Sequence, residues 1–393
     1  MKSILVKSLI LVAFCFINFS CNRDKMIKSG SHIVIDLDSV LSDTPVLYSE
    51  LFSNYELIPL ENKEECAFSR IDKVKILNDT IFIMDMTTRS VYIFSPEGKF
   101  LGKVCRPGRG PEEYLGAVDF DIDPFERLIF ILDWSGRKIN VYDFNGNFCR
   151  KIVLENRYSG FAARDGNFFL YMPFPKLKDE DDYRLIHFCD SRGSVKWEKL
   201  NSDSFLRGPD IIHHIQGGNF FGAADDIKFY MPFCNSIYSL TGNSVKPFIE
   251  LKTKQFKLTI SDLEPFNLDN YSYYKLAEAG KLTCIENYSE SGNIAFFSVS
   301  IGLKQAKIFY FFDTERIICT RRLVDDLTSL YPSFLQLNNY KMVACLSPSV
   351  KIGKLKDSIS SGKLNLPGAV RETILRYDEN SNPILVVFEL KKH

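Results

Sequence analysis

The sequence has no excess of charge of either sign, and this excludes one class of partner. Lysine and arginine together number 49, and aspartate and glutamate also number 49. Proteins that bind nucleic acid usually carry a basic surface that neutralises phosphates. Nucleic acid is therefore not an expected partner of this chain.

The sequence also lacks the motifs of common hydrolases and nucleotide-binding enzymes. The patterns H-E-x-x-H, G-x-S-x-G and G-x-x-x-x-G-K-[ST] are absent, and there are only five histidines. The adjacent His213 and His214 would point to opposite faces of a strand, so they cannot chelate one ion together. The acidic run Asp179–Asp182 is interpreted as a solvated loop rather than a metal site. We predict no cofactor and no metal centre.

Paired cysteine motifs are missing as well. No C-x-x-C occurs, and several cysteines lie inside apolar, strand-like runs, as Cys319 and Cys345 do. Beyond Cys15 and Cys21 the chain has eight cysteines, at 66, 105, 149, 189, 234, 284, 319 and 345. We interpret these eight as small core residues. Disulfides are the alternative, because exported proteins can form them.

No apolar run near the start of the chain is long enough to span a bilayer. Lys2 and Lys7 precede an apolar segment from Leu9 to about Phe19, which is typical of a secretion signal. The segment ends at Ser20-Cys21, which resembles a bacterial lipoprotein cleavage site. Residues 1–20 are thus predicted to be a signal peptide, and Cys21 the lipidated first residue of the mature chain. An ordinary signal peptide is the alternative.

What the sequence does contain is abundant core material and an internal repeat. Hydrophobic residues make up 45% of the chain and aromatic residues 13%, which is typical of a folded globular protein. Ile81–Phe100 (IFIMDMTTRSVYIFSPEGKF) is echoed 48 positions later by Ile129–Phe148 (IFILDWSGRKINVYDFNGNF). Each copy alternates short strands with turn residues. A repeat of this length predicts the blades of a β-propeller.

The repeat can be followed along the chain by its turn glycines. Gly98, Gly146, Gly193 and Gly242 are 48, 47 and 49 residues apart, and each lies between two strand-like segments. The strands expected around them form four units, and two further units follow in 293–323 and in 333–346 with 384–390. The predicted fold is all-β, a six-bladed propeller of four-stranded antiparallel blades. The roughly 340 residues after the tether, divided by a period of about 48, permit seven blades as the alternative.

Propeller closure and two inserts complete the predicted organisation. Residues 21–45 are expected to be a tether with a short strand at His32–Leu37, and 46–393 a single propeller domain. A strand at His32–Leu37 or at Tyr55–Leu60 should pair within the sheet that contains Ile384–Leu390. Pro59 places the second of these at a sheet edge. Inserts 252–282 and 350–378 are expected to carry short helices near Tyr273–Ala279 and at Ala369–Tyr377.

These features together resemble the six-bladed β-propeller lipoproteins of Bacteroides and its relatives, a family akin to NHL-repeat propellers. The resemblance covers nearly the whole chain. It rests on the lipoprotein-like start, YELIPLE at 55–61, the doublet above, GRGPEEY at 108–114 and Asn382-Pro383-Ile384-Leu385. Where this family more often has Gly-Pro-Gly-Glu-Tyr, Glu112 replaces a glycine here. The resemblance favours six blades over seven.

The loop at 106–114 is the first candidate binding site. Its Arg106 and Arg109 could grip an anionic group, and the carboxylates of Glu112 and Glu113 could bind a cation or a sugar hydroxyl. The alternative is a structural loop between blades, with Tyr114 packed beneath it.

The second candidate is a pair of aspartates at equivalent positions of the repeat. Asp85 and Asp133 follow homologous strands and could line one end of the central channel, where carboxylates could bind Ca²⁺. Acceptance of backbone hydrogen bonds in blade turns is the alternative. The aromatic clusters of the strands are interpreted as packing between blades rather than as sugar platforms.

We expect a monomeric, non-catalytic propeller, tethered to a membrane of the bacterial cell envelope. One face or the central channel would bind an envelope protein, a peptide or a glycan. The alternative is an enzyme, a propeller lyase or glycan hydrolase, whose acid and base come from scattered loop carboxylates.

Overall fold

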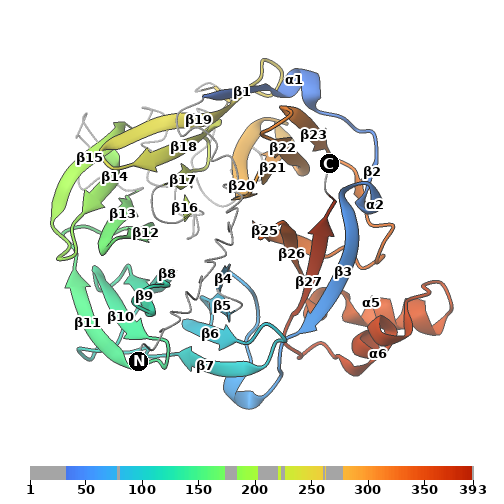
Figure 1. Cartoon of the computed structure of the whole chain (residues 1–393), viewed down its shortest axis with the longest axis horizontal. Helices are drawn as coiled ribbons and strands as arrows, with labels where there is room; N and C mark the ends of the chain where they lie inside the picture. Colours follow the sequence, from blue (N-terminus) through green and yellow to red (C-terminus); the bar gives the residue numbers. More distant parts are fainter. Residues whose placement is uncertain are drawn as a thin grey trace, which may run out of the picture.

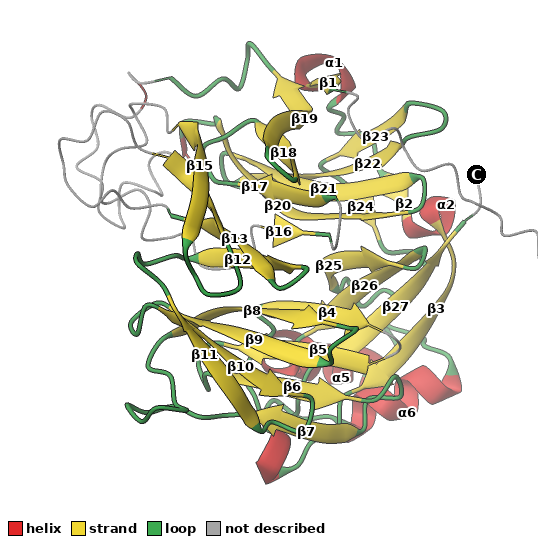
Figure 2. Ribbon diagram, turned by 60° about the vertical axis from the view of Figure 1, so that its left-hand side comes forward, coloured by secondary structure: helices red, strands yellow, loops and turns green. Residues whose placement is uncertain are grey.

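The computed structural model describes residues 32–77, 80–172, 184–201, 220–222, 226–259, 262 and 278–391. The strands form six blades arranged around a central axis (Figure 1). Seen obliquely, the blades are twisted sheets stacked side by side around the ring (Figure 2). The predicted six-bladed propeller is confirmed.

Each blade is a meander of antiparallel strands that runs outward from the axis. Blades 1 to 3 are β4 (Lys73–Leu77) to β7 (Phe100–Val104), β8 (Ala117–Asp123) to β11 (Phe148–Val153), and β12 (Gly160–Arg164) to β15 (Val195–Asn201). Their middle strands are β5 (Thr80–Asp85), β6 (Ser90–Phe94), β9 (Leu128–Asp133), β10 (Lys138–Asp143), β13 (Asn167–Tyr171) and β14 (Arg184–Cys189).

Blades 4 to 6 follow the same plan. Blade 4 comprises β16 (Phe220–Phe221), β17 (Ile227–Tyr230), β18 (Ser236–Thr241) and β19 (Ser244–Lys252). Blade 5 comprises β20 (Leu282–Ser291), β21 (Ile294–Ile301), β22 (Lys304–Phe311) and β23 (Arg316–Thr320). Blade 6 comprises β25 (Ser333–Asn338), β26 (Lys341–Leu346), β27 (Ile384–Leu390) and β3 (Phe52–Pro59).

The ring is closed by a strand from the start of the described chain. β3 pairs antiparallel with β27 and is the outermost strand of blade 6, so the edge position predicted for Tyr55–Leu60 is confirmed. β1 (Ile33–Asp36) instead pairs parallel with β19 and adds a fifth strand to blade 4. The propeller sheets therefore include residues before the predicted boundary at 46. β2 (Val46–Leu47) pairs with β24 (Leu323–Val324).

The repeated turn glycines have a defined geometric role. Gly98, Gly146, Gly193 and Gly242 all have positive φ, a backbone conformation that residues with a Cβ rarely adopt. A Cβ on Gly98 or Gly193 would lie 2.3 Å from the carbonyl oxygen of Pro59 or Val153, in the outermost strand of the preceding blade. Gly98 and Gly193 therefore lie where one blade approaches the backbone of the next.

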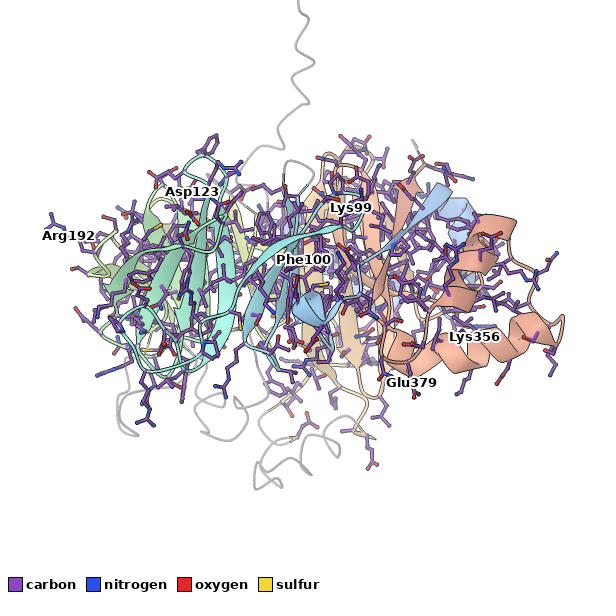
Figure 3. All side chains as sticks on the ribbon, turned by 90° about the horizontal axis from the view of Figure 1, so that it is seen from below. Lys99, Phe100, Asp123, Arg192, Lys356 and Glu379 are labelled. Carbon is purple, nitrogen blue, oxygen red and sulfur yellow. The ribbon has the colours of Figure 1, made fainter. Side chains whose placement is uncertain are left out.

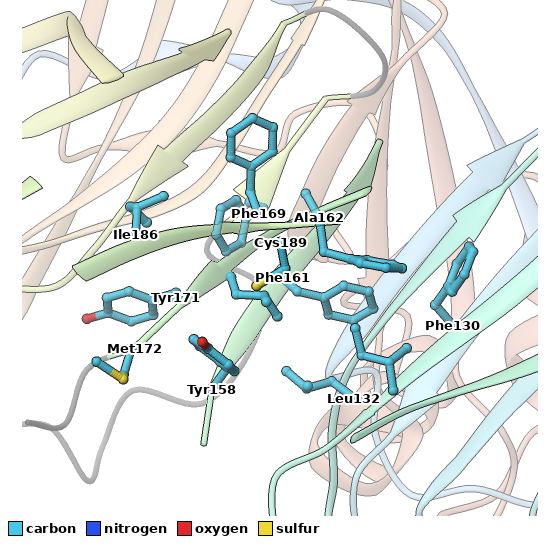
Figure 4. Close-up of a cluster of buried hydrophobic side chains, with 14 of the residues drawn as sticks. Phe130, Leu132, Tyr158, Phe161, Ala162, Phe169, Tyr171, Met172, Ile186 and Cys189 are labelled. Carbon is cyan, nitrogen blue, oxygen red and sulfur yellow. The ribbon is translucent and has the colours of Figure 1, made fainter. Parts of the chain in front are cut away.

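The core lies within and between the blades. Figure 4 shows one cluster, in which Phe130 and Leu132 of blade 2 face Phe161, Phe169 and other apolar residues of blade 3. All eight cysteines after Cys21 are free thiols. Cys66, Cys189 and Cys319 are buried, whereas Cys105 and Cys149 are exposed, so the interpretation as core residues is wrong for these two. The aromatic residues of the strands pack against one another, as Phe188 does on Trp197 with ring centroids 5.3 Å apart.

The helices lie outside the blade pattern. α5 (Pro348–Ser360) and α6 (Gly368–Arg376) form a pair beside blade 6 (Figure 1). α6 confirms the predicted helix at 369–377, whereas α5 was not predicted. Short helices α1 (Leu37–Val40), α2 (Tyr48–Leu51) and η1 (Glu64–Cys66) flank the first strands. Among the described residues, no helix is long and apolar enough to cross a membrane.

Several predictions fall outside the described residues and stay predictions. These are the signal peptide with Cys21, the acidic run 179–182, the histidine pair 213–214 and most of the helix near 273–279.

Candidate functional site

The six inner strands enclose a cavity of about 370 Å³ on the propeller axis. This volume is within the range of small-molecule sites. Its wall is formed by Ile71–Leu77, Asp121, Ile122, Pro124, Ala163, Phe220–Gly222, Tyr230, Asn287, Tyr288, Glu290, Ser291 and Leu335–Asn339. Apart from β4 and from Tyr230 of β17, the lining residues lie toward the ends of the inner strands or just after them. At this end each inner strand turns through a hairpin into the second strand of its blade. The cavity is therefore nearer the face of the propeller that carries these hairpins. In the edge-on view Asp123, at the end of β8, lies on the same side of the disc as Lys99 (Figure 3).

A ladder of ion pairs forms the wall between blades 1 and 2. Lys73 and Lys75 alternate on β4, so both side chains point to the same face of the strand. The Lys73 Nζ lies 2.6 Å from Asp119 Oδ1, and Lys75 forms the matching pair with Asp121. The lysine side chains keep 12% and 24% of their surface exposed, whereas the two aspartates are almost fully buried.

The same aspartates join blade 2 to blade 3. The second oxygen of Asp119 accepts the Phe161 N–H at 3.0 Å, and that of Asp121 accepts the Ala163 N–H at 2.8 Å. Each first oxygen also accepts the N–H of the next residue in β8. The carboxylates are therefore saturated by structural bonds, which explains how these charges can be buried. Each ammonium, with three N–H donors, still has donors to offer the cavity.

A second polar cluster lies between blades 4 and 5. The Lys228 side chain is only 1% exposed, and its ammonium contacts Asp226 and lies 3.4 Å from Glu290 Oε1. The Tyr288 hydroxyl donates to Glu290 Oε2 at 2.8 Å. Burial raises the pKa of the Glu290 carboxyl, although Lys228 and the Tyr288 hydrogen bond oppose the shift. Burial also raises the pKa of the Tyr288 hydroxyl.

The wall formed by blades 5 and 6 has amide side chains. Asn287 donates to the Phe334 carbonyl, and Ser289 accepts the Leu337 N–H at 2.8 Å, so β20 is joined to β25 by side-chain bonds. On β25, Gln336 and Asn338 alternate with the buried Leu337 and line the cavity. No hydrogen bond joins either side-chain amide to another residue in the described part of the chain.

The remaining wall between blades 4 and 5 is aromatic. Phe221 is half-buried and meets the Tyr288 ring edge-on, with centroids 5.9 Å apart. Tyr230 lies beside Tyr288 at 6.4 Å. The cavity thus has ion-paired, amide and aromatic walls.

The predicted loop at 106–114 lies at the other end of blade 2. It precedes β8 and enters that strand at its start, whereas the cavity lies toward the strand's end. Tyr114 is fully buried, and its hydroxyl donates to the Arg89 carbonyl at 2.7 Å. Burial raises the pKa of that hydroxyl. The side chains of Arg106, Arg109 and Glu112 are exposed.

The backbone of this loop is used to join it to blade 2. The Glu112 carbonyl accepts the Tyr142 hydroxyl at 2.7 Å, and Lys138 donates to the Glu113 carbonyl at 2.5 Å. Glu113 Oε2 accepts the Gly110 N–H at 2.7 Å, which closes the turn. Glu112 is not among the residues with positive φ, so this position does not require the glycine more common in the resembling family. Ligand binding by the loop stays a prediction.

Asp85 and Asp133 are buried and are not among the residues that line the cavity. Ligand binding by these two aspartates stays a prediction. Asp85 is fully buried and accepts the N–H groups of Ser69 and Thr87 at 2.9 and 2.7 Å. Asp133 in the same way accepts the N–H groups of Leu115, Gly116 and Gly136. Both end second strands and hold the turns there, because a buried carboxylate needs its hydrogen bonds satisfied. Within the described ranges, no three His, Cys, Asp or Glu side chains are grouped to hold a metal ion.

The cavity residues have a signal in the sequence, although a weak one. Lys73-Val-Lys75 and Asp119-Phe-Asp121 place charges at alternate positions of strands that are otherwise apolar. Such alternation marks a polar strand face. It does not say whether that face meets solvent, another blade or the axis.

Comparison with known proteins places the chain in a family. A family model described as "Domain of unknown function (DUF4934)" matches residues 32–389, which is nearly the whole chain. The chain belongs to this family. No curated protein matches it.

Among solved structures, at least one shares the fold of this chain at low sequence identity. A Bacteroides fragilis protein, described by its name as exported, matches with a TM-score of 0.76 and 19% identity, over 91% of this chain and all of that one. A DUF4221 member from Bacteroides vulgatus has a TM-score of 0.49 at 13% identity, covering 87% of this chain and 97% of that one. Virginiamycin B lyase from Staphylococcus aureus has a TM-score of 0.37 at 12% identity, covering 74% and 81%. The first match shows a shared fold, and the other two carry no argument about function.

Proposed function

We propose that this DUF4934 protein is a monomeric, exported binding protein of the bacterial cell envelope, and that its central cavity holds a small polar ligand. The observation that carries the proposal is the cavity of about 370 Å³. Its wall offers lysine N–H donors and side-chain amides that are available for hydrogen bonds, beside apolar rings. Such a mixture is typical of a ligand site: apolar surface supplies affinity and a few polar groups fix orientation. Binding rather than catalysis is favoured because the carboxylates at the wall are already engaged with cations.

The proposal includes the lipid anchor at Cys21 and kinship with NHL-repeat propellers. Export is supported by the signal-like residues 1–20 and by the name of the Bacteroides fragilis relative. A radiolabelled palmitate experiment tests the anchor. The label should enter the wild-type chain in a bacterial host and be lost in Cys21→Ala. Label retained by Cys21→Ala would exclude lipidation at this residue.

A cavity-filling variant tests ligand binding. Ala163 lines the cavity, so Ala163→Phe should fill part of it, whereas Val153→Phe places the same new side chain at an exposed position of β11. The full chain in detergent is screened against small polar metabolites by thermal shift. Compounds that stabilise the wild type should also stabilise Val153→Phe but not Ala163→Phe. Equal stabilisation of Ala163→Phe would contradict binding in the cavity.

An enzyme, a lyase or glycan hydrolase, is the second candidate because of one observation. Glu290 is a cavity carboxyl with a raised pKa, bonded to a tyrosine hydroxyl, as a general acid often is. Once a ligand is known, Glu290→Gln separates the two functions. An enzyme would convert the ligand and lose this conversion in the variant while still binding, whereas a binding protein would release the ligand unchanged in both forms.

A further inference from the structure

Every charged side chain at the cavity wall already has a partner of opposite charge. Asp72 pairs with Arg70 at 2.6 Å, in addition to the pairs of Lys73, Lys75 and Glu290 described above. A charged ligand would lose its hydration on entry without finding an uncompensated counter-charge. This favours a ligand that carries no net charge.

The wall nevertheless offers many hydrogen bonds. The amides of Gln336 and Asn338 each present two donors and a carbonyl acceptor, and the ammonium groups of Lys73 and Lys75 present further donors. A ligand that satisfies both kinds of group must itself donate and accept. Hydroxyl groups do both.

One wall of the cavity is apolar, and this restricts the ligand further. The half-buried ring of Phe221 lies beside Tyr288, and Ile71, Ile76 and Leu335 also line the space. A pyranose ring has C–H groups on its faces and hydroxyls around its rim. It can therefore place a face on the ring of Phe221 while its rim reaches the amides and ammonium groups.

We propose that the central cavity binds a neutral saccharide of one or two sugar units. The inference rests on the proposed function, since it names the ligand class of the same cavity. It assigns Gln336 and Asn338 as hydrogen-bonding residues and Phe221 as the apolar platform.

Titration calorimetry on the full chain tests this assignment, in a detergent without a sugar headgroup. The neutral probes are glucose, galactose, N-acetylglucosamine, maltose and cellobiose, and the charged probes are glucuronate, glucosamine and inorganic phosphate. At least one neutral sugar should bind. The double variant Gln336→Ala/Asn338→Ala should weaken that binding by about tenfold or more, because each lost hydrogen bond costs a few-fold in affinity. Asn54→Ala, an exposed amide on β3 of the same blade, should bind as the wild type does.

Three results would overturn the inference, and they also separate it from the proposed function. If only charged probes bind, and Ala163→Phe abolishes their binding, the saccharide assignment fails while the cavity function stands. If the double variant binds a neutral sugar as tightly as the wild type does, the assigned residues are wrong. If sugar binding survives Ala163→Phe, the site lies elsewhere and both proposals fail. Thermal melts of each variant confirm that loss of binding is not loss of folding.

Discussion

At the scale of single residues, the repeat is a turn with two requirements, a side-chain acceptor and a glycine. Asp143 and Asp190 each accept the N–H groups two and four residues later, and Ser95 does so through its hydroxyl. Three residues after each comes a glycine of positive φ. The glycines were visible in the sequence by their spacing. The close approach of Gly98 and Gly193 to the preceding blade was not visible, because it depends on how two blades pack.

Alanine at two of these glycines should have unequal effects on stability. Gly193→Ala places a Cβ 2.3 Å from the Val153 carbonyl at a φ of +86°, so it should lower the free energy of unfolding by about 2–4 kcal/mol. At Gly242 the φ is +48° and no atom lies within 4 Å of the new Cβ, so about 1 kcal/mol is expected. Chemical denaturation measures both. Equal losses would mean that the contact between blades is unimportant.

The turn at Asp190 should make stability depend on pH in the acid range. Its bond to Lys196, followed by the Ser194 N–H, lowers the pKa of the carboxyl from 3.8 to about 2. A lowered pKa in the folded state means that the contribution is present above pH 3.8 and lost as the pH falls toward 2. The stability difference between wild type and Asp190→Asn should therefore shrink over this window.

Lys196→Gln removes the main cause of the lowered Asp190 pKa. Its free energy of unfolding should therefore depend less on pH between 3.8 and 2 than that of the wild type does. A difference between wild type and Asp190→Asn that stays constant from pH 6 to pH 2 would contradict this assignment.

At the scale of elements, most strands could be predicted from sequence because they alternate apolar and polar residues or are apolar throughout. Two inner strands could not be predicted. β12 (GFAAR) is short and contains glycine and alanine, and β20 (LTCIENYSES) is polar because it lines the axis. α5 was also missed, since Gly353 and several serines lower its helix propensity. Tertiary packing forms these elements. The closing strand was predictable because Pro59 marks a sheet edge.

Closure depends on one buried amide that joins the two ends of the propeller. Asn382 is fully buried, accepts the Phe68 N–H at 3.0 Å and donates to the carbonyls of Glu61 and Cys66 at 2.7 and 2.9 Å. Asn382→Ala removes all three of these hydrogen bonds, so the free energy of unfolding should fall by about 2–5 kcal/mol. Asn380→Ala, an exposed neighbour, should change it by less than about 0.5 kcal/mol. Comparable losses in the two variants would exclude this role for Asn382.

At the scale of the whole molecule, the repeat predicted a propeller and the family resemblance favoured six blades, but neither located the site. Lys73 and Asp119 are 46 residues apart and meet only because adjacent inner strands face one axis. By contrast, the loop 106–114 stood out in sequence as a dense local motif, and its backbone joins blades 1 and 2. A candidate site is recognised in a sequence most easily when its residues are close along the chain. A propeller cavity takes its residues from every blade.

The most direct test of the central claim is hydrogen–deuterium exchange of the full chain with and without a bound small ligand. The ligand should slow exchange in the inner-strand segments 73–77, 287–291 and 335–339, and it should leave exchange in 106–114 unchanged. Slowed exchange at 106–114 with no change in the inner strands would contradict binding in the central cavity.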